Sequence, residues 1–102
     1  MNIAKEIIFN SEKPCTLPIS KTETTNIFAV GLIKEQILAK HKTQWPTLLI
    51  VLRGTISFRI NSETIILSAL DTYQIPIDTE HDVTGIDVEN IFLITKVKAE
   101  IK

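Results

Sequence analysis

The sequence predicts an all-β protein, a sandwich or a barrel, and three observations favour this class. Short runs of strand-forming residues recur along the chain, turn-forming residues separate them, and no stretch has a convincing amphipathic helical pattern. The chain has 102 residues, which is the size of one domain and enough for a single core. No internal repeat, linker or low-complexity segment divides it, so we expect one domain over residues 1–102.

The first 25 residues are expected to form an N-terminal strand and loop that precede a barrel core at 26–97. Lys5–Phe9 has the composition of a first strand. Asn10–Pro18 contains two prolines and is therefore interpreted as a loop or an edge strand. Asn26–Ile33 is a second strand candidate. Lys34–Lys40 contains good helix formers but no N-cap residue precedes it, so an extended or turning segment is predicted.

The middle of the chain carries the strongest strand signals. Thr47–Arg53 is apolar at successive positions, which predicts a strand buried on both faces and ended by Gly54. Thr55–Ile60 alternates apolar and polar residues, as a strand with one buried face does. Asn61–Glu63 is expected to be a tight hairpin turn, because asparagine tolerates positive φ. The remaining predicted strands are Thr64–Leu67, Thr72–Ile75, His81–Val88 and Asn90–Val97.

The composition argues against a nucleic-acid-binding protein. The chain has 11 basic and 12 acidic residues, a net charge of −1, whereas a nucleic-acid-binding domain usually carries a basic excess. Lys96, Lys98 and Lys102 alternate with apolar residues and with Glu100, which indicates a solvated strand face or tail rather than a basic block. We therefore expect no nucleic-acid partner.

The chain also has the features of a cytoplasmic protein. Cys15 is the only cysteine, so no intrachain disulfide can form, which fits a reducing compartment. The N-terminal residues contain charges and no long apolar core, unlike a secretory signal. The longest apolar run, Leu48–Leu52, is far too short to cross a membrane. We expect neither a membrane partner nor export.

Three segments in order, covering about two thirds of the chain, resemble the motifs of the cupin family. "HKTQWPTLLIVLRG" (His41–Gly54) has the histidine, apolar strand and glycine of the first motif, and "LDTYQIPIDTEH" (Leu70–His81) has the acidic turn, strand, proline and histidine of the second. "DVTGIDVENIFLIT" (Asp82–Thr95) is similar to the two closing strands. The resemblance implies a double-stranded β-helix, a jelly-roll barrel whose open mouth binds small molecules.

The resemblance also implies a degenerate metal site. The first cupin motif usually supplies two histidines and a glutamate, and the second supplies a further histidine. Here His41 and His81 stand at two of these positions, while Thr43 and Thr47 replace the second histidine and the glutamate. Two of four ligands remain, and a threonine hydroxyl is a poor substitute for a carboxylate. Two turn glycines are also replaced, by Leu70 and Asp78; aspartate tolerates left-handed dihedrals, whereas leucine there has no ready explanation.

The two histidines are expected to meet in the barrel mouth, and three interpretations of them are open. They are metal ligands, they bind an organic ligand without a metal, or they are packed and inert. We take the second as the leading hypothesis, with no cofactor, and keep a divalent transition metal held by His41 and His81 as an alternative. The expected ligand-binding residues are His41, Thr43, Trp45, Thr47, Phe58 and His81, with Ile56, Val83 and Phe92 as further apolar lining.

The function expected from this pattern is small-molecule binding, as in the small cupins of uncharacterised function that the chain resembles. The alternative is a metal-dependent or histidine-based cupin enzyme of the dioxygenase, isomerase or epimerase type, so whether the chain is an enzyme stays open. Catalytic residues are not identifiable, because no carboxylate occupies a motif position. The apolar segments Asn26–Ile33 and Leu48–Leu52 further predict a twofold homodimer.

Overall fold

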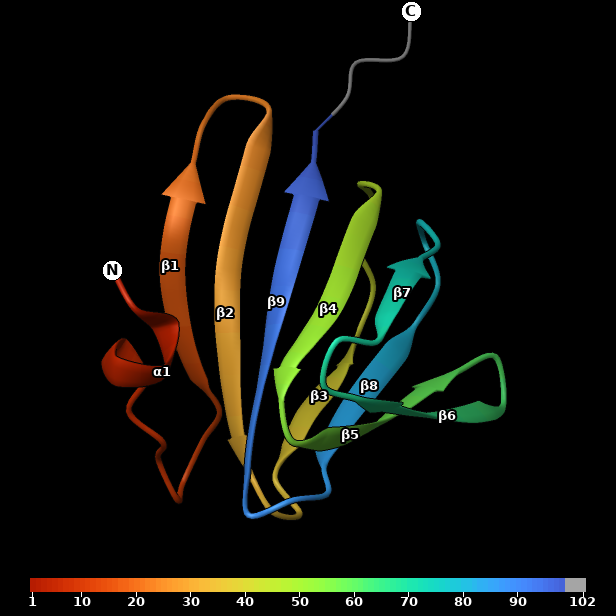
Figure 1. Ribbon diagram of the computed structural model, residues 1–102. Coiled ribbons are helices and arrows are strands. Elements are labelled where there is room, and N and C mark those ends of the chain that lie inside the picture. Colours follow the sequence, from red (N-terminus) through yellow and green to blue (C-terminus); the bar gives the residue numbers. More distant parts are fainter. Residues whose placement is uncertain (99–102) are drawn as a thin grey trace, which may run out of the picture.

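The computed structural model describes residues 1–98, and within them the chain forms one short helix and nine strands (Figure 1). Glu100 and Lys102 of the predicted tail lie outside the described residues. The elements are α1 (Ile3–Glu6), β1 (Cys15–Lys21), β2 (Thr25–Ile33), β3 (Ile37–His41), β4 (Thr47–Arg53), β5 (Thr55–Ile60), β6 (Glu63–Ser68), β7 (Thr72–Ile75), β8 (His81–Gly85) and β9 (Glu89–Val97). No helix in this part of the chain is long and apolar enough to span a membrane.

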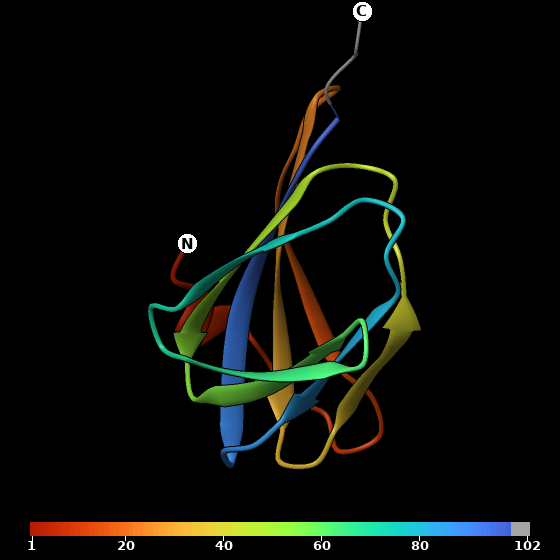
Figure 2. The same cartoon turned by 90° about the vertical axis from the view of Figure 1, so that its right-hand side faces the viewer.

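Two antiparallel sheets face each other. One has five strands in the order β1-β2-β9-β4-β7, and the other has four in the order β3-β8-β5-β6. Figure 1 looks onto the five-stranded sheet with the other behind it, and Figure 2 shows the two from the side. The predicted all-β class and its jelly-roll topology are thus confirmed.

The main core lies between the sheets. Alternate residues of each strand point inward, so Leu49 and Val51 of β4 meet Ile56 and Phe58 of β5 in one buried cluster. The inner face of β9 adds Phe92 and Ile94 to the same cluster. This alternation continues along β9 toward the open end of the barrel, where the inward side chains of β9 line the site described below.

Most predicted strands are confirmed. The predicted segments Thr47–Arg53, Thr55–Ile60 and Thr72–Ile75 coincide with β4, β5 and β7. The hairpin after β5 turns through Asn61 and Ser62, with φ of 51° and 64°, as the predicted tight turn requires. The segment after β2 turns at residues 34–36 and then extends as β3, as expected for Lys34–Lys40.

The predicted first strand is wrong. Residues 3–6 form a helical turn, capped by Asn2, whose side chain accepts a hydrogen bond from Lys5 N at 3.1 Å. The chain after it packs Ile7 and Phe9 on the outer face of β2, where Gly31 leaves room for both side chains. The segment therefore buries its apolar side chains on the face of a sheet and does not pair as a strand, which strand propensity alone had suggested. The proline-containing segment ends in β1, an edge strand, which is the position that tolerates Pro18.

Two further expectations about the strands are corrected. β4 is buried on one face only, because Leu48 and Leu52 point away from the core and are 38% and 36% exposed. The strand that begins at His81 ends at Gly85 rather than Val88. Gly85 bonds to the turn before β3, with Glu35 N donating to Gly85 O at 2.9 Å and Gly85 N donating to Gln36 O at 3.0 Å.

Candidate functional site

Two loops lie side by side at one end of the barrel and bring the histidines together (Figure 2). One loop, 42–46, follows β3, and the other, 76–80, precedes β8. Asp78, at a φ of 53°, donates its backbone N–H to Thr43 O at 2.8 Å and ties the loops together. His41 ends β3 and His81 begins β8, and the two are paired in the register of these strands.

The two imidazole rings are in contact. Their centroids are 4.3 Å apart with an interplanar angle of 62°, an edge-to-face arrangement. His81 is only 4% exposed and stacks on Phe58 at a centroid distance of 5.4 Å, whereas His41 is exposed at the rim. The prediction that the histidines meet is therefore correct, with one deep and one at the surface.

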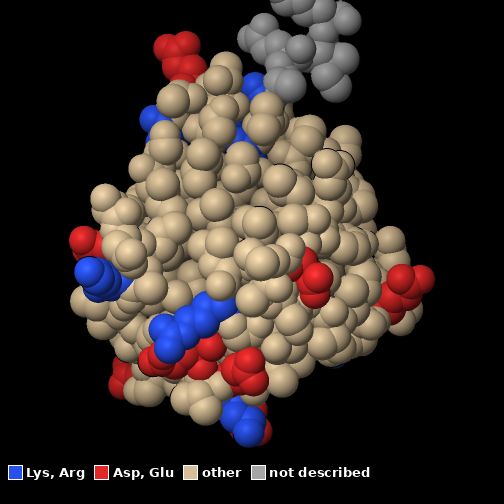
Figure 3. All heavy atoms as spheres, in the orientation of Figure 1, with Lys and Arg blue, Asp and Glu red and all other residues tan. Residues whose placement is uncertain are grey.

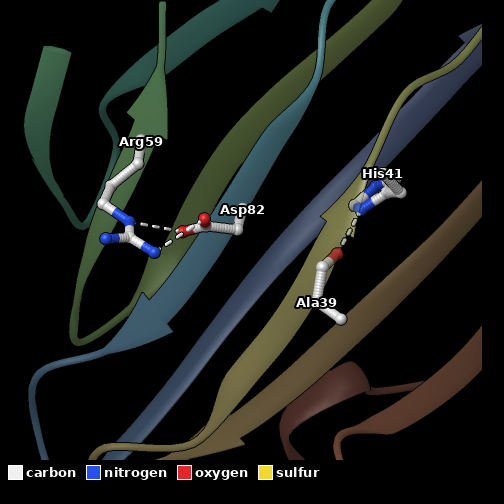
Figure 4. Close-up of polar contacts among 4 residues, drawn as sticks. All are labelled: Ala39, His41, Arg59 and Asp82. Carbon is white, nitrogen blue, oxygen red and sulfur yellow. Dashed lines mark hydrogen bonds and ion pairs between the residues drawn. The ribbon is translucent and has the colours of Figure 1, made fainter. Parts of the chain in front are cut away.

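The backbone fixes the tautomer of both rings. His41 Nδ1 lies 2.8 Å from Ala39 O (Figure 4), and His81 Nδ1 lies 3.0 Å from Thr79 O. A carbonyl oxygen only accepts hydrogen bonds, so Nδ1 carries the hydrogen in each ring. Each Nε2 then holds a lone pair when its ring is neutral, and no residue within 1–98 is hydrogen-bonded to either Nε2.

The surroundings of His81 favour its neutral form. Burial is the main cause that lowers the pKa of His81 below its ordinary value, and the positive charges of His41 and Lys96 lower it further. The hydrogen bond to Thr79 and the carboxylate of Asp82 act in the opposite direction without reversing the shift. His81 is thus a neutral hydrogen-bond acceptor near pH 7.

A cavity of about 370 Å³ opens beside the histidines, between the two sheets. Of the predicted ligand-binding residues, His41, Thr43, Thr47, Phe58 and His81 line it. Trp45 does not, and its backbone instead bonds to the hydroxyls of Thr43 and Thr47, at 3.3 and 2.9 Å. The remaining lining is mostly apolar and includes Phe28, Leu38, Leu49, Ile75, Val83, Phe92 and Ile94.

Two expectations about the lining need correction. Ile56 lies in the closed core between the sheets rather than at the cavity. Lys96, interpreted from the sequence as part of a solvated face or tail, is half-buried and lines the cavity. Strand alternation puts Lys96 on the same face of β9 as Phe92 and Ile94, and the pairing of β9 with β4 brings that face to the cavity at Lys96.

The residues present do not fit the metal site that the cupin fold implies. Two imidazoles are available, but no carboxylate lines the cavity, and no group of three histidine, cysteine or acidic side chains in residues 1–98 could hold an ion. The hydroxyls of Thr43 and Thr47 already bond to the Trp45 backbone. Catalytic zinc and non-haem iron sites take at least three protein ligands, so this donor set falls short.

One ion pair of the four-stranded sheet lies outside the cavity. Arg59 of β5 donates two hydrogen bonds, each of 2.9 Å, to the carboxylate of Asp82 on β8 (Figure 4). Those bonds hold the pKa of Asp82 below its usual value and raise that of Arg59. Asp82 is almost fully buried, so this pair fastens β5 to β8 next to His81.

Solved structures with the same fold confirm the architecture. A cupin superfamily protein from Desulfitobacterium hafniense superposes with a TM-score of 0.87 at 14% identity, over 97% of this chain and 90% of that one. An RmlC-like cupin protein from Desulfovibrio desulfuricans gives 0.87 at 19% identity, over 96% and 94%. A conserved protein of unknown function from Streptococcus pyogenes gives 0.85 at 18% identity, over 99% and 88%.

The sequence itself matches no protein-family model and no curated protein. At these identities the structural likeness establishes the fold alone. The chain therefore has the double-stranded β-helix of the cupins, as the three sequence motifs implied.

Proposed function

We propose that this protein binds a small organic molecule in the cavity beside His81, without a tightly held metal ion. The observation that carries the proposal is the cavity itself, which has an apolar wall and one polar end where the two histidines meet. Small-molecule sites have this composition and volumes of about 300–1,000 Å³. The free Nε2 atoms provide the oriented polar contacts that such a site needs.

The geometry around the histidines supports ligand binding over inert packing. A packed histidine uses both ring nitrogens within the protein, whereas each of these rings uses only Nδ1. Phe58 supports the His81 ring from one side, and Tyr73 packs on Phe58 with ring centroids 4.8 Å apart. The acceptor that His81 presents to the cavity is thus held in a fixed direction.

A ligand screen with a blocked-mouth variant tests the proposal. Ala39 is exposed and lines the cavity, so an Ala39→Trp substitution fills the mouth without entering the core. Ile37 lies on the same strand, is 54% exposed and does not line the cavity, so Ile37→Trp is the matched control. Compounds that perturb the backbone amide NMR signals of β8 and β9 in the native protein and in Ile37→Trp, but not in Ala39→Trp, would support it. If no compound binds, or Ala39→Trp binds as well as the control, the cavity is not the site.

A second function, proton abstraction by His81, is favoured by its neutral state and free Nε2. A neutral imidazole is a suitable general base near pH 7. Bound ligands with an acidic C–H bond would then exchange that hydrogen for deuterium in D₂O, and His81→Gln would abolish the exchange. A ligand that binds but shows no exchange above the rate without protein would leave binding as the function.

The cellular setting and assembly belong to the same proposal. We propose a cytoplasmic protein, since its lone Cys15 fits a reducing compartment. We also propose a twofold homodimer. Figure 3 shows a broad area with few charged side chains on the outer face of the five-stranded sheet. Ile7 and Phe9 cover part of β2 there, and Leu48 and Leu52 of β4 are exposed.

A further inference from the structure

The cavity has an unbalanced set of ionisable side chains. Among residues 1–98, the titratable residues that line it are Lys40, His41, His81 and Lys96, with no aspartate or glutamate. The nearest buried carboxylate, Asp82, faces the other side of β8 and is already paired with Arg59. The polar end of the cavity therefore carries only neutral or positive groups.

Lys96 is the cation best placed to act on a ligand. It is paired with Thr47 across β4 and β9, and Thr47 lines the cavity too. Its Nζ lies 5.5 Å from the centre of the Phe28 ring, which is part of the cavity wall. Lys96 makes no ion pair with any carboxylate in residues 1–98. An ammonium that is half-buried against aromatic carbon has no counter-ion there, so an anion beside it stabilises it strongly.

The rest of the cavity wall indicates the chemical nature of the body of the ligand. Phe58, Ile75, Val83 and Phe92 offer only carbon to the cavity, so a sugar-like body with hydroxyls on all sides would leave its polar groups without partners there. An alkyl or aryl body would bury its surface at no such cost.

We propose that the natural ligand is an amphipathic carboxylate, with its carboxylate bound by Lys96 and its apolar body along the Phe58 and Phe92 walls. This inference rests on the proposed function and specifies the chemical class of the ligand. The exposed Lys40 at the rim adds to the positive potential at the entrance. An ionised carboxylate only accepts hydrogen bonds, so His81 donates one to this head group from Nε2 once its ring is protonated.

Octanoate and octanamide are the probes, because they share the apolar body and differ in the charge of the head group. Their affinities are measured by titration calorimetry on the full chain and on three variants. Lys96→Met removes the charge and keeps the length of the side chain, and Lys96→Arg keeps the charge. Lys34→Met removes the same charge from an exposed turn outside the cavity, and is the matched control.

We expect the native protein to bind octanoate about tenfold more tightly than octanamide, the usual worth of a hydrogen bond to a charged group. The preference should persist in Lys96→Arg and Lys34→Met and vanish in Lys96→Met, whose NMR spectrum shows whether it is folded. Equal affinity of the native protein for both probes would overturn the carboxylate assignment and leave the cavity as a binding site. If Lys34→Met lost the preference for octanoate as fully as Lys96→Met, the carboxylate assignment would also be overturned. If neither probe binds while uncharged compounds do, only this inference fails, and if nothing binds, the proposed function fails with it.

Discussion

His41 and His81 face each other across β3 and β8, with ring centroids 4.3 Å apart and each Nδ1 bonded to a backbone carbonyl two residues earlier. Both rings therefore present Nε2 as their free nitrogen. The pair forms the polar end of an otherwise apolar cavity, and its chemistry leads to the first two predictions.

The first prediction concerns metal content. Because residues 1–98 bring two imidazoles and no carboxylate to the cavity, the purified untagged protein should retain far less than one ion per chain after incubation with iron, zinc, manganese or nickel and removal of free metal. Elemental analysis measures this. Near-stoichiometric metal that disappears in a His41→Ala, His81→Ala double variant would contradict the prediction and favour an enzyme.

The second prediction concerns the pH dependence of stability. Burial lowers the pKa of His81 in the folded protein below its ordinary value of 6.5. Between that value and the lower folded pKa, the unfolded chain binds more protons, so the free energy of unfolding should fall as the pH falls through this window and should be constant above it. Thermal unfolding between about pH 5 and pH 8 measures the effect.

His81→Gln should flatten this pH dependence while His41→Gln leaves most of it, because His41 is exposed. The other charged groups around His81 are Lys96 and Asp82, and the carboxylate of Asp82 is paired with Arg59. A pH profile that is unchanged in His81→Gln would show that another group is responsible.

The third prediction compares two ion pairs. Arg59→Met leaves the carboxylate of Asp82 buried without its partner, and should lower the free energy of unfolding more than the loss of an exposed ion pair does. Arg53→Met breaks an exposed pair with Glu89 at 3.2 Å and should cost about 0–1 kcal/mol. Urea unfolding of both variants tests the difference, and equal losses would contradict it.

The fourth prediction concerns the turn between β4 and β5. Gly54 has a φ of +77°, and a Cβ there would collide with Glu89 O and with the side chain of Asn90. Asn90 is fully buried, and its Oδ1 accepts a hydrogen bond from Thr55 N at 2.9 Å. Gly54→Ala should therefore cost at least about 2 kcal/mol, from the left-handed backbone together with damage to this contact.

Gly31→Ala is the control for this substitution. Its new Cβ would approach only the side chains of Ile7 and Phe9, at 3.0 and 3.1 Å, and these can shift because they lie on the N-terminal segment. Chemical denaturation should show a smaller decrease in the free energy of unfolding for Gly31→Ala than for Gly54→Ala. A Gly54→Ala variant as stable as the native protein would refute the role assigned to this turn.

The fifth prediction concerns assembly. If the outer face of the five-stranded sheet joins two copies, a charge in its middle should separate them. Light scattering should give a dimer for the native protein and a monomer for Leu48→Lys, with Ile66→Lys, on the outer face of the other sheet, still a dimer. A native monomer at micromolar concentration would refute the dimer.

Much of the fold was predictable because its signals are local. The alternation over Thr55–Ile60 and the turn at Asn61 each depend on a few neighbouring residues, and both were found. Leu70 occupies a left-handed conformation with φ of 76°, at a position where cupins usually have glycine. The resemblance to the motif therefore indicates this backbone conformation, whereas leucine as a residue type disfavours it. The meeting of His41 and His81 also followed from the motifs.

The sequence by itself determined most of the strands, the all-β class and the presence of two histidines in the barrel mouth. Only the tertiary structure decided that Ile3–Glu6 is helical, that Trp45 lies outside the cavity and that Lys96 lines it. The physical reason is that these three facts depend on contacts between distant segments. Ile7 is placed by the outer face of β2, and Lys96 by the register of β9 against β4. Local propensity carries no information on a register that is set by the packing of two sheets.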